Sequence, residues 1–312
     1  MAPLTRLRSD EEGIPPAFAA AYYAQRATDG EVLIAEGTSV SAMGVGTLAH
    51  PDSPARRRWT LEAVTQAVHD KGGKIFVQLW HAGYVRDPLN HPGEALSVSS
   101  STASMDDVEN FAVTREGRKT YVTPRPLETR EIAGVVEDYR KAAAAAIETG
   151  FDGVELHLAN GYLLEQSARF FFEALDAITS SVESSKVGVR VSPFGVTFGC
   201  TDSSPAETYS YVIDKLNAYN LAYLHVLEPR GNHFKSPLVP EIGVTATSRP
   251  LCKGAYLTAS GYDRESALQV TESGTANLVA FGRDFISTPD LVRRRQLGEV
   301  GYTDYPFMDE SA

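Results

Sequence analysis

The sequence predicts a single (β/α)8 barrel domain that spans residues 1–312. Short apolar runs alternate with helical patterns along the whole chain, which is the order expected of parallel βαβ units. Counting a strand end at residues 1–5, we expect eight strands, the number that closes such a barrel. No linker or change of composition divides the chain, and α/β barrels of this length commonly form one domain.

The first half of the chain is expected to supply four strands. The runs VLIA and KIFVQLW are continuously apolar or nearly so, as buried parallel strands are, and Gly72-Gly73 ends the helix before KIFVQLW. Residues 84–125 show no sustained period, which is typical of a binding loop. The elements expected here are strands at 1–5 (truncated), 32–35, 74–80 and 154–157, and helices at 17–28, 57–71 and 129–149.

The second half repeats the alternation. We expect strands at 187–191, 223–227, 255–259 and 278–281, and helices at 167–180, 204–219 and 264–272. The alternative architecture is an open doubly wound sheet, which would carry a glycine-rich G-x-G-x-x-G turn directly after an early strand. The sequence contains no such turn, and the strand count favours the barrel.

Composition excludes several classes of protein. The net charge of -11 disfavours nucleic acid and anionic membranes as partners, because both bind basic surfaces. The two cysteines, Cys200 and Cys252, are too few and too far apart for a disulfide framework or a cysteine-ligated metal site. With no membrane-length apolar run and no signal peptide expected, we predict a cytoplasmic protein without a metal, present as a monomer or a homodimer.

The stretch FDGVELHLANGYLLEQ places three polar side chains where a strand ends. His157, Asn160 and Tyr162 follow the apolar run at 154–156, and in a (β/α)8 barrel that edge carries the chemistry. Alone, His157 would more often be a structural group than a catalytic one. Together, the three side chains indicate hydrogen bonding to, or proton transfer with, a ligand.

Other predicted strand ends carry groups that suit a flat cofactor with a phosphate. The Gln78 amide can donate to and accept from a pyrimidine-like edge, and Arg190 can hold negative charge there. Glycine-containing turns after the last two strands, with Arg283, match the phosphate site that barrels build in that position. Each has a simpler explanation by itself: an ion pair for Arg190, a core amide for Gln78, a solvated charge for Arg283.

Eight motifs in one order resemble the Old Yellow Enzyme family of flavin-dependent ene-reductases. They are MAPLTR, FVQLWHAG, HLANGYLLEQ, VGVRVSPFG, LAYLHVLEP, GYDRE, AFGR and GYTDYP. The resemblance implies non-covalent FMN at the barrel mouth. The implied cofactor-binding residues are Pro3, Leu4, Thr5 and Ala35 along the ring, Gln78 and Arg190 at its polar edge, and Ser260, Gly261, Gly282 and Arg283 at the phosphate.

The resemblance also implies a reaction. His157 and Asn160 would bind the carbonyl or nitro oxygen of an activated alkene, and Tyr162 would give a proton to its α-carbon. NADPH would supply the hydride through FMN, and Trp80 would shape the wall of the substrate pocket. The implied activity is NADPH-dependent reduction of the C=C bond of an enone-like small molecule, in secondary metabolism.

Several positions depart from the family pattern. The family segment after Gln166 is absent, the loop at 297–301 is short, Leu158 replaces a small residue, and Ser260 replaces glycine. Leu158 is therefore expected to narrow the substrate pocket. Two alternatives stay open: a redox-neutral relative that isomerises, epimerises or cyclises its substrate, and a non-catalytic barrel that binds a ligand.

Overall fold

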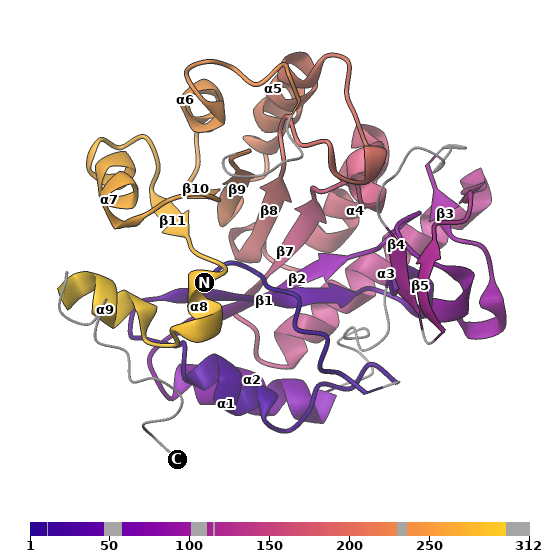
Figure 1. Ribbon diagram of the computed structural model, residues 1–312, viewed down its shortest axis with the longest axis horizontal. Helices are drawn as coiled ribbons and strands as arrows, with labels where there is room; N and C mark the ends of the chain where they lie inside the picture. Colours follow the sequence, from indigo (N-terminus) through magenta and orange to yellow (C-terminus); the bar gives the residue numbers. More distant parts are fainter. Residues whose placement is uncertain (11, 47–57, 101–110, 115, 230–235, 298–312) are drawn as a thin grey trace.

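Seven parallel strands form one curled sheet in the computed structural model, which describes residues 1–10, 12–46, 58–100, 111–114, 116–229 and 236–297 (Figure 1). Every neighbouring pair of strands in this sheet is parallel. The strands, in sheet order, are β1 (Val32–Ser39), β2 (Lys74–Trp80), β7 (Gly153–Leu158), β8 (Val187–Val191), β9 (Tyr223–Leu227), β10 (Tyr256–Ala259) and β11 (Leu278–Ala280).

The chain start joins the two ends of this sheet. Met1 donates from its N-terminal ammonium to the Val32 oxygen at 2.8 Å and accepts from the Ile34 nitrogen at 2.9 Å. The Ala2 nitrogen donates to the oxygen of Phe281, directly after β11, at 2.8 Å. Residues 1–5 therefore do not form the expected eighth strand, because only Met1 and Ala2 bond to the neighbouring backbone. The backbone of these two residues nevertheless occupies the closing position of the barrel, between β1 and the end of β11.

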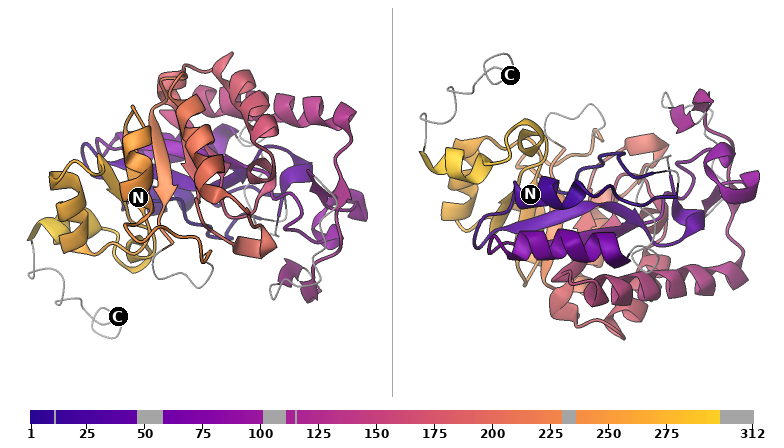
Figure 2. Two further views of the ribbon diagram at one scale, coloured as in Figure 1. Left: turned by 90° about the horizontal axis from the view of Figure 1, so that it is seen from above. Right: turned by 90° about the horizontal axis from the view of Figure 1, so that it is seen from below.

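Helices lie outside the curled sheet (Figure 2). α1 packs against α2 and α3 against α4. Polar caps fix several helix starts: Ser167 accepts from the Phe170 nitrogen at α4, and Asp263 with Ser266 forms a capping box at α7. The helices are α1 (Ala19–Ala24), α2 (Arg58–His69), α3 (Thr129–Glu148), α4 (Ala168–Thr179), α5 (Pro205–Leu216), α6 (Val244–Ser248), α7 (Arg264–Glu272), α8 (Asp284–Ser287) and α9 (Leu291–Leu297).

The expected alternation of strands and helices is confirmed, with differences at particular elements. β1 is longer than expected because its pairing with β2 shifts between Ala35 and Thr38, and this bulge hides the strand pattern. The short helices α6, α8 and α9 were not predicted, because four to seven residues are too few to show a helical period.

The stretch at 84–125 contains structure of its own. The strands β4 (Phe111–Thr114) and β5 (Gly117–Thr120) form an antiparallel hairpin, and β3 (Val98–Ser99) pairs with β6 (Arg125–Pro126).

Short 3-10 turns lie between these elements along the described chain. They are η1 (Ala42–Gly44), η3 (Pro88–Asn90), η4 (Pro92–Glu94), η5 (Leu163–Gln166), η6 (Ser184–Lys186), η7 (Thr197–Gly199) and η8 (Arg249–Leu251).

The central strands are buried along their whole length. Every residue of β7 and of β8 is buried, as parallel strands covered by helices on one side and barrel core on the other must be. The polar groups on them, including His157 and Arg190, are therefore shielded from solvent. Among the described residues, no helix combines the length and the apolar character that a bilayer crossing needs.

Candidate active site

His157 and Arg190 lie opposite each other on the adjacent strands β7 and β8. Both are buried, and the Nδ1 atom of His157 and the Nε atom of Arg190 have no hydrogen-bond partner in the described part of the chain. Burial holds the pKa of His157 well below its ordinary value, and the electrostatic effects of Arg190 and the neighbouring His225 act in the same direction. His157 is therefore a neutral imidazole near pH 7.

An aromatic cluster meets His157 at the strand ends. The ring of Tyr162 contacts the His157 ring with centroids 5.0 Å apart, and it contacts the ring of Trp80, the last residue of β2, at 4.7 Å. Phe198 lies on a further side of Tyr162 at 6.0 Å. Burial raises the pKa of the Tyr162 phenol above its ordinary value, so this group keeps its proton near pH 7.

Asn160 joins Arg190 and Ser260 in one cavity at the barrel mouth. This cavity has a volume of about 110 Å³ and is also lined by the segments after β8 and β9. Asn160 stands in a left-handed turn with φ +59°, and its backbone nitrogen donates to Ser192 Oγ at 2.9 Å. Ser260 also adopts a positive φ, +85°, a conformation that favours glycine over residues with a Cβ.

A buried polar network holds Gln78. Its Nε2 donates to Glu155 Oε1 at 2.8 Å, and the other oxygen of Glu155 pairs with His225 Nδ1 at 2.8 Å. A Cβ at Gly37, in the β1 bulge, would lie 3.3 Å from Gln78 Oε1. The bond to Glu155 thus fixes the amide so that its carbonyl oxygen is directed toward the bulge.

Charge in this network is balanced between Glu155 and Arg190. Burial acts to raise the pKa of Glu155, but His225 and Arg190 hold it below its ordinary value, so the carboxylate is ionised. Burial lowers the pKa of Arg190, and Glu155 opposes that effect. A guanidinium remains charged even when buried, so it offers a positive charge beside the cavity.

The remaining predicted cofactor residues lie at the closing edge of the barrel. Ala35 is buried on β1, Pro3 and Leu4 are half-buried, and Thr5 is exposed. A Cβ at Gly282 would lie 3.2 Å from the Leu4 side chain, so the chain start and the turn after β11 touch. The other members of the set behave as follows: Gly261 has φ +73°, and Arg283 is exposed at the start of α8.

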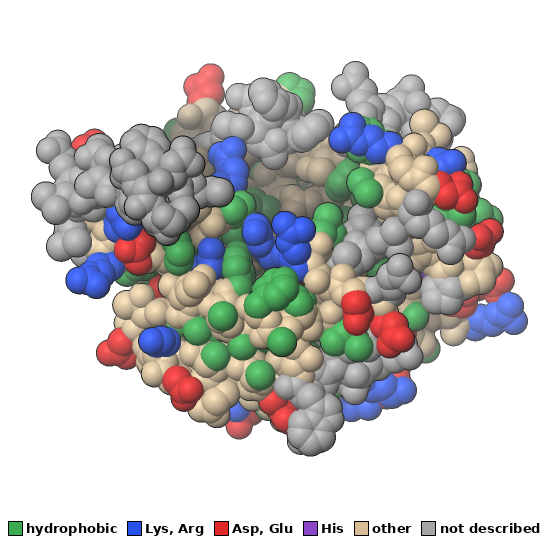
Figure 3. Space-filling model, turned by 60° about the horizontal axis from the view of Figure 1, so that its bottom comes forward, with side chains coloured by type: hydrophobic (Ala, Val, Ile, Leu, Met, Phe, Trp, Pro, Cys, Tyr) green, Lys and Arg blue, Asp and Glu red, His purple; other side chains and the backbone are tan. Residues whose placement is uncertain are grey.

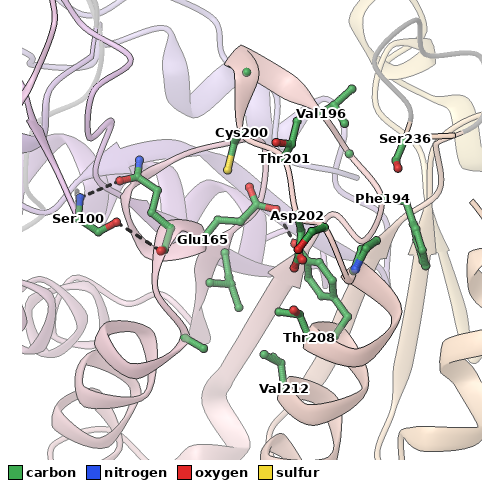
Figure 4. A pocket seen from close by; sticks show the side chains of 18 of the residues that line it. Ser100, Glu165, Phe194, Val196, Cys200, Thr201, Asp202, Thr208, Val212 and Ser236 are labelled. Atoms are coloured by element: carbon green, nitrogen blue, oxygen red, sulfur yellow. Dashed lines mark hydrogen bonds between the residues drawn. The ribbon is translucent and has the colours of Figure 1, made fainter. Parts of the chain in front are cut away.

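Leu158 does not line the cavity of Asn160 and Arg190. Successive side chains on a strand point to opposite sides, and Leu158 lines a larger cavity of about 490 Å³ between the starts of α4 and α5 (Figure 4). Most of its polar lining residues carry hydroxyl groups or carboxylates.

Elsewhere, one face of the molecule is hollowed near its centre, with basic and hydrophobic side chains at the border of the recess (Figure 3).

Sequence reasoning did not identify the residues that support the site. Glu155 could have been noticed as an acidic residue inside the apolar run VELHL, since a buried charge needs a partner. Its partner His225 lies 70 residues away, and nothing local in the sequence connects the two. Glu165 and Gln166 belong to the motif HLANGYLLEQ, but the sequence assigned neither a role, because nothing local shows what their side chains contact.

The chain is similar to known proteins over nearly its whole length. Residues 1–168 and 164–299 match the family model of the NADH:flavin oxidoreductase / NADH oxidase family. The 12-oxophytodienoate reductase 1 of Oryza sativa subsp. japonica is 37% identical over 350 residues, which cover 99% of this chain and 89% of that protein.

Solved structures resemble the whole fold. Morphinone reductase superimposes with a TM-score of 0.87 at 36% identity, covering 99% of this chain and 92% of that one. The old yellow enzyme homologue from Zymomonas mobilis superimposes with a TM-score of 0.86 at 30% identity, covering 99% and 95%. A further morphinone reductase structure is a complex with tetrahydroNAD.

The alignment with the rice protein also shows a difference in length. The rice alignment extends over 350 positions although this chain has 312 residues, so the relative has residues without counterparts here. The two matches to the family model meet at 164–168, at the edge of the 490 Å³ cavity.

Proposed function

Because the chain belongs to the Old Yellow Enzyme family of FMN oxidoreductases, we propose that it reduces the activated C=C bond of an α,β-unsaturated carbonyl or nitro compound. NADPH is the proposed hydride donor. The names 12-oxophytodienoate reductase and morphinone reductase both denote enzymes whose substrates contain a carbonyl group. The complex of morphinone reductase with tetrahydroNAD supports a nicotinamide as the hydride donor.

The observation that carries the proposal is the buried ring of His157. A buried polar atom without a partner costs about 1–3 kcal/mol, and a ligand oxygen at Nδ1 would remove that cost. Because His157 is neutral, one of its ring nitrogens can donate to such an oxygen without separating charge. Asn160 would supply a second donor from the turn that follows β7.

The side chains present fit FMN. Arg190 has a buried Nε without a partner, which suits a ring edge that gains negative charge, and Gln78 presents a fixed carbonyl oxygen. Bound FMN would supply the chemistry that side chains lack, since it takes a hydride from the nicotinamide and gives it to the substrate β-carbon. The proposed cofactor-binding residues are Pro3, Leu4, Thr5, Ala35, Gln78, Arg190, Ser260, Gly261, Gly282 and Arg283.

Tyr162 is the proposed acid. It keeps its proton at neutral pH, and it donates only to a strongly basic carbon such as the α-carbon of a forming enolate. Its contacts with His157 and Trp80 fix the ring and exclude water from that side. Trp80 would also limit the size of the substrate.

Anaerobic spectroscopy of the FMN-saturated protein tests this proposal. NADPH should bleach the flavin band, more rapidly than NADH, and 2-cyclohexen-1-one should restore it. A protein that does not bind FMN rejects the proposal. A bound flavin that neither nicotinamide reduces would favour the redox-neutral isomerase, epimerase or cyclase instead.

A further inference from the structure

Two residues of η5 bind the backbone of Gly161, one at its N–H group and one at its carbonyl oxygen. Glu165 Oε2 accepts a hydrogen bond from the Gly161 nitrogen, and Gln166 Nε2 donates to the Gly161 oxygen at 3.2 Å. Gly161 stands between Asn160 and Tyr162. Asn160 has the proposed substrate-binding role and Tyr162 the proposed proton-donating role. They are thus joined by a glycine whose two peptide groups Glu165 and Gln166 fix.

The same carboxylate also reaches the neighbouring backbone nitrogen. Ser192 Oγ donates to Glu165 Oε1 at 2.8 Å and accepts from the Asn160 nitrogen at 2.9 Å. Tyr209, on α5, donates to the same Glu165 oxygen at 2.6 Å. Two successive N–H groups of the turn therefore end at one carboxylate, directly or through one hydroxyl.

Gln166 is anchored in turn by a distant segment. Its Oε1 accepts from Ser99 Oγ and from the Ser100 nitrogen, both at 3.0 Å. This leaves the Nε2 group no freedom to turn away from Gly161, because the amide would lose two bonds. The turn after β7 is thus connected to β3 on one side and to β8 and α5 on the other.

The turn has an unusual backbone. Asn160 has φ +59° and Gly161 has φ +79°, so two consecutive residues adopt left-handed conformations. Glycine adopts this conformation freely, and asparagine tolerates it better than most residues with a Cβ. A Cβ at Gly161 would lie 2.7 Å from the Thr197 oxygen, so the peptide is also closely packed. Hydrogen bonds from outside the turn therefore hold a closely packed, left-handed backbone in place.

Glu165 and Gln166 also lie at the junction of the two family matches, where they line the 490 Å³ cavity. Figure 4 shows the Glu165 side chain in the middle of this region, between Ser100 and the α5 residues Thr208 and Val212.

We propose that Glu165 and Gln166 are positioning residues, which hold the Asn160–Tyr162 turn in the orientation that oxygen binding and proton donation need. This inference rests on the proposed reductase function. Glu165 touches neither substrate nor cofactor in this account, and it acts through Tyr162 and Asn160. A misplacement of about 1 Å at a reacting group can cost on the order of 10²-fold in rate.

The test is a double-mutant cycle on the enone-driven reoxidation of reduced flavin. Glu165→Gln keeps the shape but replaces one acceptor oxygen by a donor, and it should slow reoxidation about 10- to 100-fold. Added to Tyr162→Phe, it should slow the reaction by a smaller factor than it does alone, because the acid it orients is already gone and only its effect through Asn160 remains. Fully additive effects would overturn the inference, as would an unchanged rate in the single variant. Glu173→Gln, which alters a carboxylate on α4 outside these contacts, is the matched control.

A second variant and a second measurement separate the possible failures. Ser192→Ala removes only the branch to the Asn160 nitrogen and should slow reoxidation less than Glu165→Gln does. Hydrogen exchange at 159–166 reports on the turn without turnover, and it should accelerate in Glu165→Gln while FMN affinity stays unchanged. If wild-type protein shows no enone-driven reoxidation, the proposed function fails. Unaltered exchange in Glu165→Gln overturns the positioning role whatever the function.

Discussion

The rings of His157 and Tyr162 meet edge to face, with centroids 5.0 Å apart and planes inclined at 70°. One is a neutral imidazole and the other a protonated phenol near pH 7, and burial is the main cause in both. The group proposed to bind the substrate oxygen and the group proposed to donate the proton therefore lie in direct contact. A substitution of either residue is expected to change ligand affinity, the rate of proton transfer, or both.

Removing the imidazole tests the oxygen-binding role. His157→Ala should weaken binding of p-hydroxybenzaldehyde by about 10- to 100-fold, the loss expected of one or two hydrogen bonds. Titration of the flavin absorbance at fixed protein concentration gives the dissociation constant. His69→Ala, at a half-exposed histidine at the end of α2, should leave it unchanged. Unchanged phenol affinity in His157→Ala would remove His157 from this role.

Tyr162→Phe tests the proton donor. The phenylalanine ring keeps the contacts with His157 and Trp80 but has no proton to give. Enone-driven reoxidation should slow by on the order of 10²- to 10⁴-fold, while flavin reduction by NADPH stays near the wild-type rate. Stopped-flow absorbance separates the two half-reactions. Tyr211→Phe, at an exposed tyrosine, is the control. Equal losses in both half-reactions would contradict the assignment.

Glu155→Ala tests the buried network. The substitution leaves Gln78 Nε2 and His225 Nδ1 without an acceptor in a site from which water is excluded. The free energy of unfolding should fall by about 3 kcal/mol, the range for breaking a buried charged hydrogen-bond network. Urea unfolding followed by circular dichroism measures it, with Glu173→Ala as the surface comparison. A loss below about 0.5 kcal/mol would show that the network contributes nothing to stability.

Glu36 should make stability depend on pH. Burial raises the pKa of its carboxyl from 4.5 to about 7, against the opposing hydrogen bond from the Arg6 nitrogen. Between these values the folded chain keeps a proton that the unfolded chain has lost. The stabilisation is therefore fully present below about pH 4.5 and is lost as the pH rises toward 7, by at most about 1.4 kcal/mol per pH unit.

Unfolding of Glu36→Gln measured from pH 5 to pH 7 checks this sign. The variant lacks the titrating group, so its stability should fall less across that interval than the wild-type stability does. Glu148→Gln, at an exposed position at the end of α3, should keep the wild-type slope. Equal slopes for Glu36→Gln and wild type would contradict the raised pKa.

Most strands of the barrel could be predicted because buried parallel strands are apolar along their length. The expected bounds of β2, β8 and β9 coincide with the observed ones, and α7 was also placed correctly. β1 was predicted too short because the bulge after Ala35 places polar and glycine residues inside it. The closing contact of Met1 and Ala2 depends on backbone hydrogen bonds, which leave no pattern in the sequence.

The site could be predicted where polar side chains lie at the end of a strand or directly after it, as His157, Asn160, Arg190 and Ser260 do, and three of these line one cavity. His157, Asn160 and Tyr162 follow a single strand, and the structure brings His157 and Tyr162 into contact. The pairing of Glu155 with His225, and of Glu165 with Ser192 and Tyr209, joins residues 27 to 70 positions apart. The first contact is set by the register of β7, β8 and β9, and the others by how η5 packs against α5 and the segment after β8, and composition and periodicity reveal neither.

The most direct test of the proposed reaction follows deuterium into the product. Turnover of 2-cyclohexen-1-one with NADPH carrying deuterium at C4 of the nicotinamide should give cyclohexanone with one deuterium at the β-carbon. The α-carbon should receive its new hydrogen from water, as NMR in ordinary and heavy water will show. A product without deuterium at the β-carbon, or substrate that returns isomerised and unreduced, would contradict the account.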